Sequence, residues 1–159
     1  MKFSAVRDIS SIGVSRILEA VINGIFWFIL ADWLSKSDYG EITYLVSISM
    51  MGFGLCGLGL DKLLVVYGAK KENVLFPTFV LGLSSTIISA LVVFVVTNNV
   101  AVSLLVIGLT IFNLHVNNLL SVPKYRLYSI FFLARRSLTT VFGLALYPLL
   151  GIEGIILGF

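Results

Sequence analysis

The residues most able to do chemistry lie on one face of the first apolar segment. Steps of three, four and four residues separate Arg16, Glu19, Asn23 and Trp27, which places all four on the same side of a helix. Ionisable groups inside a membrane are costly and usually face other helices or a watered cavity. Arg16 could therefore bind an anionic substrate group, with Glu19 holding it in position. The spacing leaves an alternative open, in which the two charges pair and anchor the helix at the inner interface while Asn23 bonds a neighbouring helix.

A second polar face occurs in a later apolar segment. The same steps of three, four and four residues separate its members, Thr110, Asn113, Asn117 and Ser121. Hydroxyl and amide side chains can join helices to one another at a modest gain in stability. A stripe along a whole span also suits the lining of a cavity that accepts a hydroxyl-rich or solvated cargo. We therefore predict that both polar faces bind substrate.

Catalytic and metal-binding chemistry finds little support in the sequence. Neither a nucleophile–base pair nor a carboxylate dyad nor a cluster of metal ligands is evident. His115 is a lone histidine without neighbouring ligands, so we expect no metal, no cofactor and no enzymatic activity. Asp61 and Lys62 close an apolar segment and are interpreted as interfacial, with a gating role as the alternative. The run Gly52–Gly57 reads G-x-G-x-x-G, but the dinucleotide fingerprint requires a preceding strand. Glycines here indicate close helix packing instead.

The elements that carry these residues are predicted to be membrane-spanning helices. The 159 residues are 58% hydrophobic and 12% charged, with a mean hydropathy of +1.06, whereas soluble domains carry about twice that charge. The uncharged run 73–123 would form a helix of roughly 76 Å, far longer than a hydrocarbon core of ~30 Å. It must fold back, and Asn98-Asn99 suits the turn. We predict an all-α integral membrane fold with five spans and the start of a sixth, at residues 14–33, 42–60, 74–96, 100–122 and 137–152.

The basic residues predict the orientation of the chain. With the N-terminus in the cytoplasm, ten Lys and Arg residues lie on the cytoplasmic side and only Lys36 on the other, which is a positive-inside bias. We therefore expect a multi-pass protein of the cell membrane. Its basic residues, which give the net charge of +3, would set the topology and contact anionic membrane lipids, and we expect no binding to nucleic acid. Residues 124–136 are basic, with Leu127, Ile130 and Phe131 at helical spacing. We interpret them as an amphipathic segment in the cytoplasmic interface; the alternative is a basic loop that runs into a long helix.

Residues 31–73 contain three short motifs in order: an L-S-x-x-D-Y-G turn at Leu34–Gly40, a G-L-G-L end of the second helix at Gly57–Leu60, and a basic, Tyr-containing exit at Tyr67–Lys71. With these motifs the segment resembles the start of polysaccharide-biosynthesis flippases, in the multidrug/oligosaccharidyl-lipid/polysaccharide exporter superfamily. The basic segment after the fourth helix and the G-I-E-G-I-I-L-G run at Gly151–Gly158 fit the same family.

The resemblance implies the flipping of a polyprenol-pyrophosphate-linked oligosaccharide for polysaccharide or surface-glycan biosynthesis, by alternating access between two helical lobes. Such proteins have a dozen or more helices, so we expect this chain to be a fragment covering most of an N-terminal lobe, or to work by self-association or with a second lobe. One alternative is a multidrug-type antiporter of the same superfamily, which would need carboxylates within its spans. The other is a non-transporting membrane scaffold for glycan synthesis, in which the polar faces could be replaced by apolar residues without loss of function.

Overall fold

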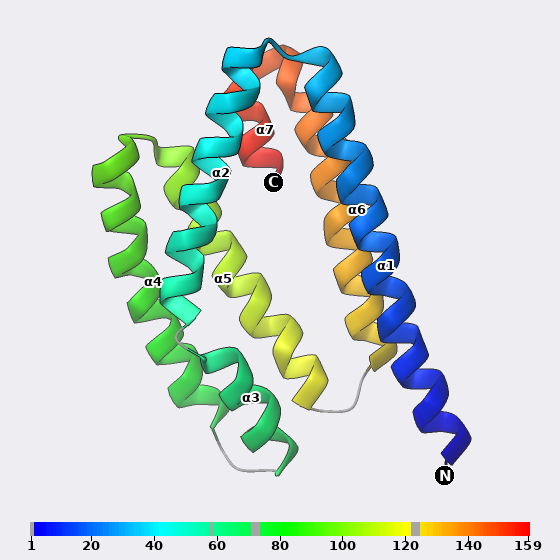
Figure 1. Cartoon of the computed structure of the whole chain (residues 1–159). Helices are drawn as coiled ribbons and strands as arrows, with labels where there is room; N and C mark the ends of the chain where they lie inside the picture. The colour runs from blue at the N-terminus through cyan, green and yellow to red at the C-terminus, as the bar shows by residue number, and fades with distance from the viewer. Residues whose placement is uncertain (1, 58, 71–73, 122–124) are drawn as a thin grey trace.

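The computed structural model describes residues 2–57, 59–70, 74–121 and 125–159, and every element in these ranges is an α-helix (Figure 1). In chain order the helices are α1 (Lys2–Trp33), α2 (Lys36–Gly57), α3 (Leu60–Ala69), α4 (Leu75–Thr97), α5 (Val100–Ser121), α6 (Tyr125–Leu150) and α7 (Ile152–Gly158). The side chains of two predicted site residues, Asp61 and Ser121, lie outside the described part of the chain.

Four of the described helices are long and apolar enough to cross a membrane: α1 over Ile12–Trp33, α4, α5 over Val100–Leu120, and α6. Many apolar side chains of these helices are exposed on the surface of the bundle, and Val95 of α4 is 80% exposed. Exposing apolar area to water costs roughly 25 cal/mol per Å², whereas lipid chains are as apolar as the side chains themselves. These features indicate a helical membrane protein, as the sequence predicted.

Short capped turns join the helices at the end of the bundle opposite the N-terminus (Figure 1). The Ser35 hydroxyl accepts a hydrogen bond from the Asp38 N–H at 3.1 Å and so caps the start of α2. Asn98 adopts a left-handed conformation, with a φ of 50°, and its N–H closes α4 onto the Phe94 carbonyl. Asn99 Oδ1 then accepts from the first N–H groups of α5. The polar triplet at residues 97–99 therefore makes the turn between α4 and α5.

The helix boundaries differ from the predicted spans in three places. The first helix, predicted over 14–33, begins at Lys2. The segment predicted as one span over 42–60 is divided, because α2 ends at Gly57, α3 begins at Leu60, and Gly59 has a φ of 82° that interrupts the helix. The segments predicted at 124–136 and 137–152 form one continuous helix, α6, from Tyr125 to Leu150. Gly151, with a φ of 61°, then reverses the chain into α7. Arg126, Arg135 and Arg136 of the predicted interfacial segment therefore lie within a long helix, and Lys124 lies outside the described residues.

The short helix α7 packs between α2, α5 and α6 and links the two apolar cores. Its Ile155 belongs to a cluster with Phe26 and Leu30 of α1, and Ile156 belongs to a cluster with Val102 and other residues of α5. A Cβ added to Gly154 would overlap the backbone of Leu146 in α6. Glycine at this position thus permits α6 and α7 to lie close together.

Helices α2 and α4 also pack through small residues. Ser89 Oγ donates to the Gly52 carbonyl at 2.9 Å, and Ser85 Oγ donates to the Cys56 carbonyl at 3.1 Å. A Cβ on Gly52 would lie 2.8 Å from Val93 Cγ2, whereas one on Gly54 would meet nothing within 4 Å. Close packing therefore explains Gly52 but not every glycine of the G-x-G-x-x-G run.

Candidate functional site

A polar cavity of about 450 Å³ lies among α1, α2, α5 and α6, next to the end of α7. This volume falls within the range of small-molecule sites, ~300–1,000 Å³. Its polar lining consists of Arg16, Glu19, Asn23, Asn113, Arg135 and Arg136. Its apolar lining comes from Trp27, Val46, Met50, Phe53, Leu109, Phe132 and Phe159.

The first predicted polar face lines this cavity along its whole length. Arg16, Glu19, Asn23 and Trp27 all contribute to the wall. Arg16 Nη1 and Glu19 Oε2 are 3.8 Å apart, so the pairing suggested by the sequence exists as a loose contact. Arg16 also donates a hydrogen bond to the Tyr128 hydroxyl of α6. Arg16 is thus tied to α6 as well as to its own helix.

The second predicted polar face does not line the cavity as a unit. Asn113 reaches the wall. Thr110 is buried, and its hydroxyl donates to the Val106 carbonyl of its own helix at 2.9 Å, so it is satisfied locally. Asn117 is half-buried and does not contribute to the described lining. Within the described residues, only Asn113 of this stripe belongs to the cavity.

Two further cavity residues, Arg135 and Arg136, escaped the sequence analysis as site candidates. They were assigned to an interfacial segment, but the continuity of α6 carries them into the bundle beside α1. One signal could have identified them. The uncharged stretch after Arg136 ends at Ile152 and is too short to span a membrane alone, so its helix had to begin earlier and include both arginines.

Aromatic rings lie against all three guanidinium groups, and in the described part of the chain only Arg16 also forms an ion pair. Arg16 lies 4.0 Å from the ring centroid of Phe132, and Arg135 lies 4.8 Å from that of Phe112. Arg136 lies 5.0 Å from the ring of Phe159. Cation–π contacts of this kind stabilise a cation by about 0.5–1 kcal/mol at an exposed site and by about 2 kcal/mol where the cation is desolvated. The rings therefore position the guanidinium groups, whose N–H donors remain able to bind an anion.

The cavity wall has an excess of positive charge and unmet hydrogen-bonding groups. Three arginines against the single carboxylate of Glu19 give a formal charge of 3 − 1 = +2. Among the described residues, the Arg16–Glu19 contact is the only ion pair. Two buried polar atoms in the described part, Arg136 Nε and Asn23 Oδ1, have no hydrogen-bond partner. Such groups are costly to leave unsatisfied, so a ligand with both acceptors and donors would complete the site.

The predicted gating pair and the lone histidine lie elsewhere. Lys62 is exposed on α3 and does not belong to the described cavity lining, and the side chain of Asp61 lies outside the described residues. His115 is exposed on α5, with its ring 5.9 Å from that of Phe131. In the described ranges, no three His, Cys, Asp or Glu residues form a group that could hold a metal ion.

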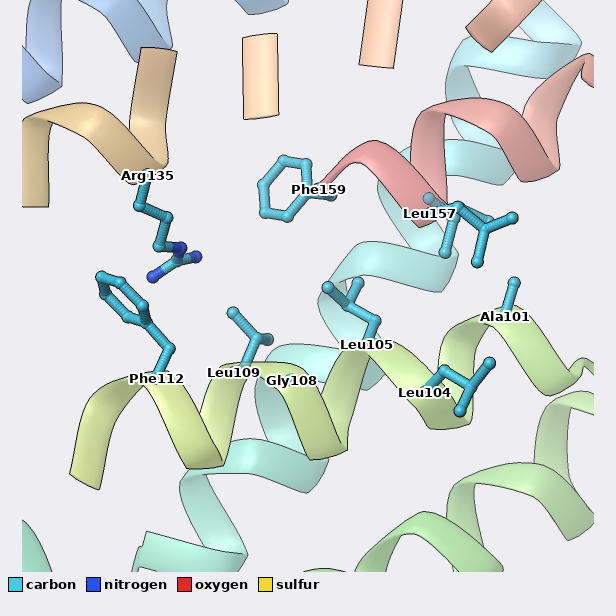
Figure 2. A pocket seen from close by; sticks show the side chains of 10 residues that line it. Ala101, Leu104, Leu105, Gly108, Leu109, Phe112, Arg135, Leu157 and Phe159 are labelled. Carbon is cyan, nitrogen blue, oxygen red and sulfur yellow. The ribbon is translucent and has the colours of Figure 1, made fainter. Parts of the chain in front are cut away.

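An apolar groove adjoins the cavity between α5 and α7. It has a volume of about 270 Å³ and shares Leu109, Arg135 and Phe159 with the polar cavity. Figure 2 shows the Arg135 guanidinium beside Phe112 at one end of the groove, with Leu105, Leu104 and Ala101 following along α5. The charged and apolar spaces therefore meet at Arg135.

No protein-family model, no curated protein and no solved structure matches the chain.

Proposed function

We propose that the protein translocates a polyprenol-pyrophosphate-linked oligosaccharide across the cell membrane, with the charged head group held in the polar cavity. The observation that supports this most directly is the arginine cluster, in which Arg16, Arg135 and Arg136 face one space with a single carboxylate. Guanidinium groups bind phosphate oxygens through parallel N–H donors. A pyrophosphate would supply anionic acceptors for the guanidinium groups that Glu19 alone does not neutralise.

The neutral polar groups of the cavity suit the sugar part of such a substrate. Asn23 Oδ1 is buried with its acceptor capacity unused, and Asn113 faces the same space. Sugar hydroxyl groups donate and accept hydrogen bonds, so they could satisfy both amides. The aromatic wall, with Trp27 and Phe159 at 6.4 Å between ring centroids, adds apolar surfaces against which sugar rings can pack.

The charge of the cavity argues against the multidrug-antiporter alternative for cationic drugs. A cationic drug would enter a space with a formal charge of +2 and would compete with Arg16 for Glu19. Like charges in a space of low dielectric repel one another strongly. An anionic substrate is therefore favoured over a cationic one.

Translocation can be tested in vesicles that contain the purified protein and a fluorescent lipid-linked pyrophosphate. The measured quantity is the fraction of lipid that a membrane-impermeant quencher reaches over time. We expect Arg136→Gln to slow translocation by about tenfold to a hundredfold, because a charge-assisted hydrogen bond contributes about 1.5–3 kcal/mol. Arg126→Gln is the matched control, since Arg126 is exposed in the first turn of α6 and outside the described cavity lining.

Two results would count against the proposal. Equal rates for Arg136→Gln and the wild type would show that the arginine cluster does not carry the head group. A wild-type rate no faster than that of protein-free vesicles would favour the scaffold alternative, in which the polar faces have no transport role.

A further inference from the structure

Tyr128 of α6 is a buried tyrosine whose hydroxyl bonds to Arg16 of α1. Its side chain is 2% exposed, and its hydroxyl oxygen accepts a hydrogen bond from Arg16 Nη2. A buried hydroxyl needs a hydrogen-bond partner, and this one uses an arginine of a different helix. Tyr128 does not belong to the described lining of the polar cavity, so its effect on a ligand there has to pass through Arg16.

The hydrogen bond places Arg16 on the face of α6 that carries Arg136. Tyr128, Phe132 and Arg136 follow one another at steps of four residues and so share one side of the helix. The rings of Tyr128 and Phe132 stack with their centroids 5.4 Å apart, and the Arg16 guanidinium lies 4.0 Å from the Phe132 centroid. The guanidinium of Arg16 therefore has two contacts on this face, a hydrogen bond and a ring.

Arg16 needs such contacts to keep its position. Its side chain is 53% exposed, and the apolar part of α1 begins one turn earlier, at Ile12. An arginine so close to the end of a span tends to extend toward the lipid head groups. Repulsion from Arg135 and Arg136, which line the same space, favours the same outward movement as long as no anion is bound.

The Tyr128 hydroxyl can hold Arg16 without neutralising it. The carboxylate of Glu19 also approaches Arg16, at 3.8 Å, but a carboxylate that held the guanidinium firmly would cancel its charge. A hydroxyl oxygen is a neutral acceptor. It orients the guanidinium and leaves the full positive charge for an anionic ligand.

We propose that Tyr128 is a positioning residue of the anion site, whose hydroxyl holds Arg16 beside Arg136 so that both guanidinium groups reach the same head group. This inference rests on the proposed function, because it concerns the arginine cluster to which that function assigns the pyrophosphate. It adds a residue outside the cavity wall on which the affinity of the site depends.

The alternative is a purely structural role, in which the hydroxyl only joins α1 to α6. The two helices lie side by side (Figure 1), and a hydrogen bond from Ser15 Oγ to Ser129 Oγ, at 3.3 Å, also joins them. Ser15 is buried and does not belong to the described cavity lining. Ser15→Ala is therefore the matched control, because it removes a hydrogen bond between the same helices and leaves the contacts of Arg16 intact.

The test is the binding of inorganic pyrophosphate to the purified full chain in detergent, measured by isothermal titration calorimetry. We expect Tyr128→Phe to weaken binding by about threefold to tenfold, the effect of one lost hydrogen bond, and Ser15→Ala to leave binding unchanged. In an Arg16→Gln background, the addition of Tyr128→Phe should weaken binding no further, because the hydroxyl acts through Arg16. A structural role predicts instead that Tyr128→Phe weakens binding equally in both backgrounds, or that Ser15→Ala weakens it as much.

A second variant and one further substitution make every outcome decisive. Tyr128→Met also fills the site without a hydroxyl, and the buried Cys56 thiol should stay unreactive in every folded variant. If either folded variant binds pyrophosphate as tightly as the wild type while Arg136→Gln binds it more weakly, only the positioning role fails. If the wild type does not bind pyrophosphate, or Arg136→Gln binds it equally well, the head-group site is wrong and the proposed function fails with it.

Discussion

The close approach of α6 and α7 predicts a large penalty for one added methyl group at Gly154. A Cβ at this position would lie 2.7 Å from the Leu146 carbonyl carbon and closer still to its oxygen, whereas carbon atoms pack at about 3.5–4.0 Å. The obstructing atoms belong to a helix backbone, so they cannot rotate away. Overpacking of this kind costs about 1–3 kcal/mol. At about 2–4 °C per kcal/mol for a chain of this size, we expect Gly154→Ala to lower the Tm by about 2–12 °C.

The single cysteine provides the assay. Cys56 is buried, so a thiol-reactive dye reports unfolding in detergent as the temperature rises. Gly24→Ala is the matched control, because a Cβ there meets nothing within 4 Å and alanine favours the helix by about 1 kcal/mol. Gly24→Ala should leave the Tm unchanged or raise it, whereas Gly154→Ala should lower it. If Gly154→Ala unfolds at the same temperature as Gly24→Ala, the packing of α7 against α6, and with it the placement of Phe159 at the cavity, would be refuted.

Two further predictions concern the charges of the cavity and the orientation of the chain. Glu19→Gln should tighten the binding of inorganic pyrophosphate severalfold, because it raises the formal charge of the lining from +2 to +3 and frees Arg16. The Tm should hardly change, because a partly exposed ion pair contributes at most about 1 kcal/mol to stability. Weaker binding of pyrophosphate by the variant would contradict the electrostatic reasoning. In a Cys56→Ala background, a membrane-impermeant thiol reagent applied to intact cells should label Ser37→Cys, in the first turn of α2, but not Arg126→Cys, since the basic end of the bundle is expected in the cytoplasm. The reverse labelling would invert the orientation.

Helical periodicity predicted the first polar face well, because a long uninterrupted helix keeps residues three and four apart on one side. Arg16, Glu19, Asn23 and Trp27 do meet in one cavity. Periodicity cannot state how much of a face a neighbouring helix covers. Thr110 therefore shares a face with Asn113 in the sequence, yet it is buried in the packing and bonded to its own helix.

The helix boundaries were predictable where polar residues mark a turn. The predicted segments 74–96 and 100–122 differ from α4 and α5 by one residue at most, because Asn98 and Asn99 supply both a left-handed residue and a helix cap. The break after Gly57 was not predictable from hydropathy. It depends on the φ of Gly59, and glycine is equally compatible with close packing inside a helix.

The arginines of α6 were misplaced because charges were counted along segments of the sequence, and this count does not show which charged side chains enter the helix bundle. Arg135 and Arg136 follow other basic residues in the sequence, so they were grouped with an interfacial segment. Aromatic side chains on α5 and directly after α7 allow a helix to carry these cations into the bundle, since Phe112 lies over Arg135 and Phe159 over Arg136. That compensation comes from distant parts of the chain and becomes visible only in the folded structure.

The most direct test of the central claim, that the arginine cluster forms an anion site, is the binding of inorganic pyrophosphate. The protein has two tryptophans, and Trp27 lines the cavity, so Trp33→Phe leaves one fluorescent reporter at the site. We expect a saturable change in Trp27 emission on titration with pyrophosphate, and its loss when Arg136→Gln is added to the same background. A folded Trp33→Phe protein that shows no saturable response, or one that responds equally with and without Arg136, would contradict the account.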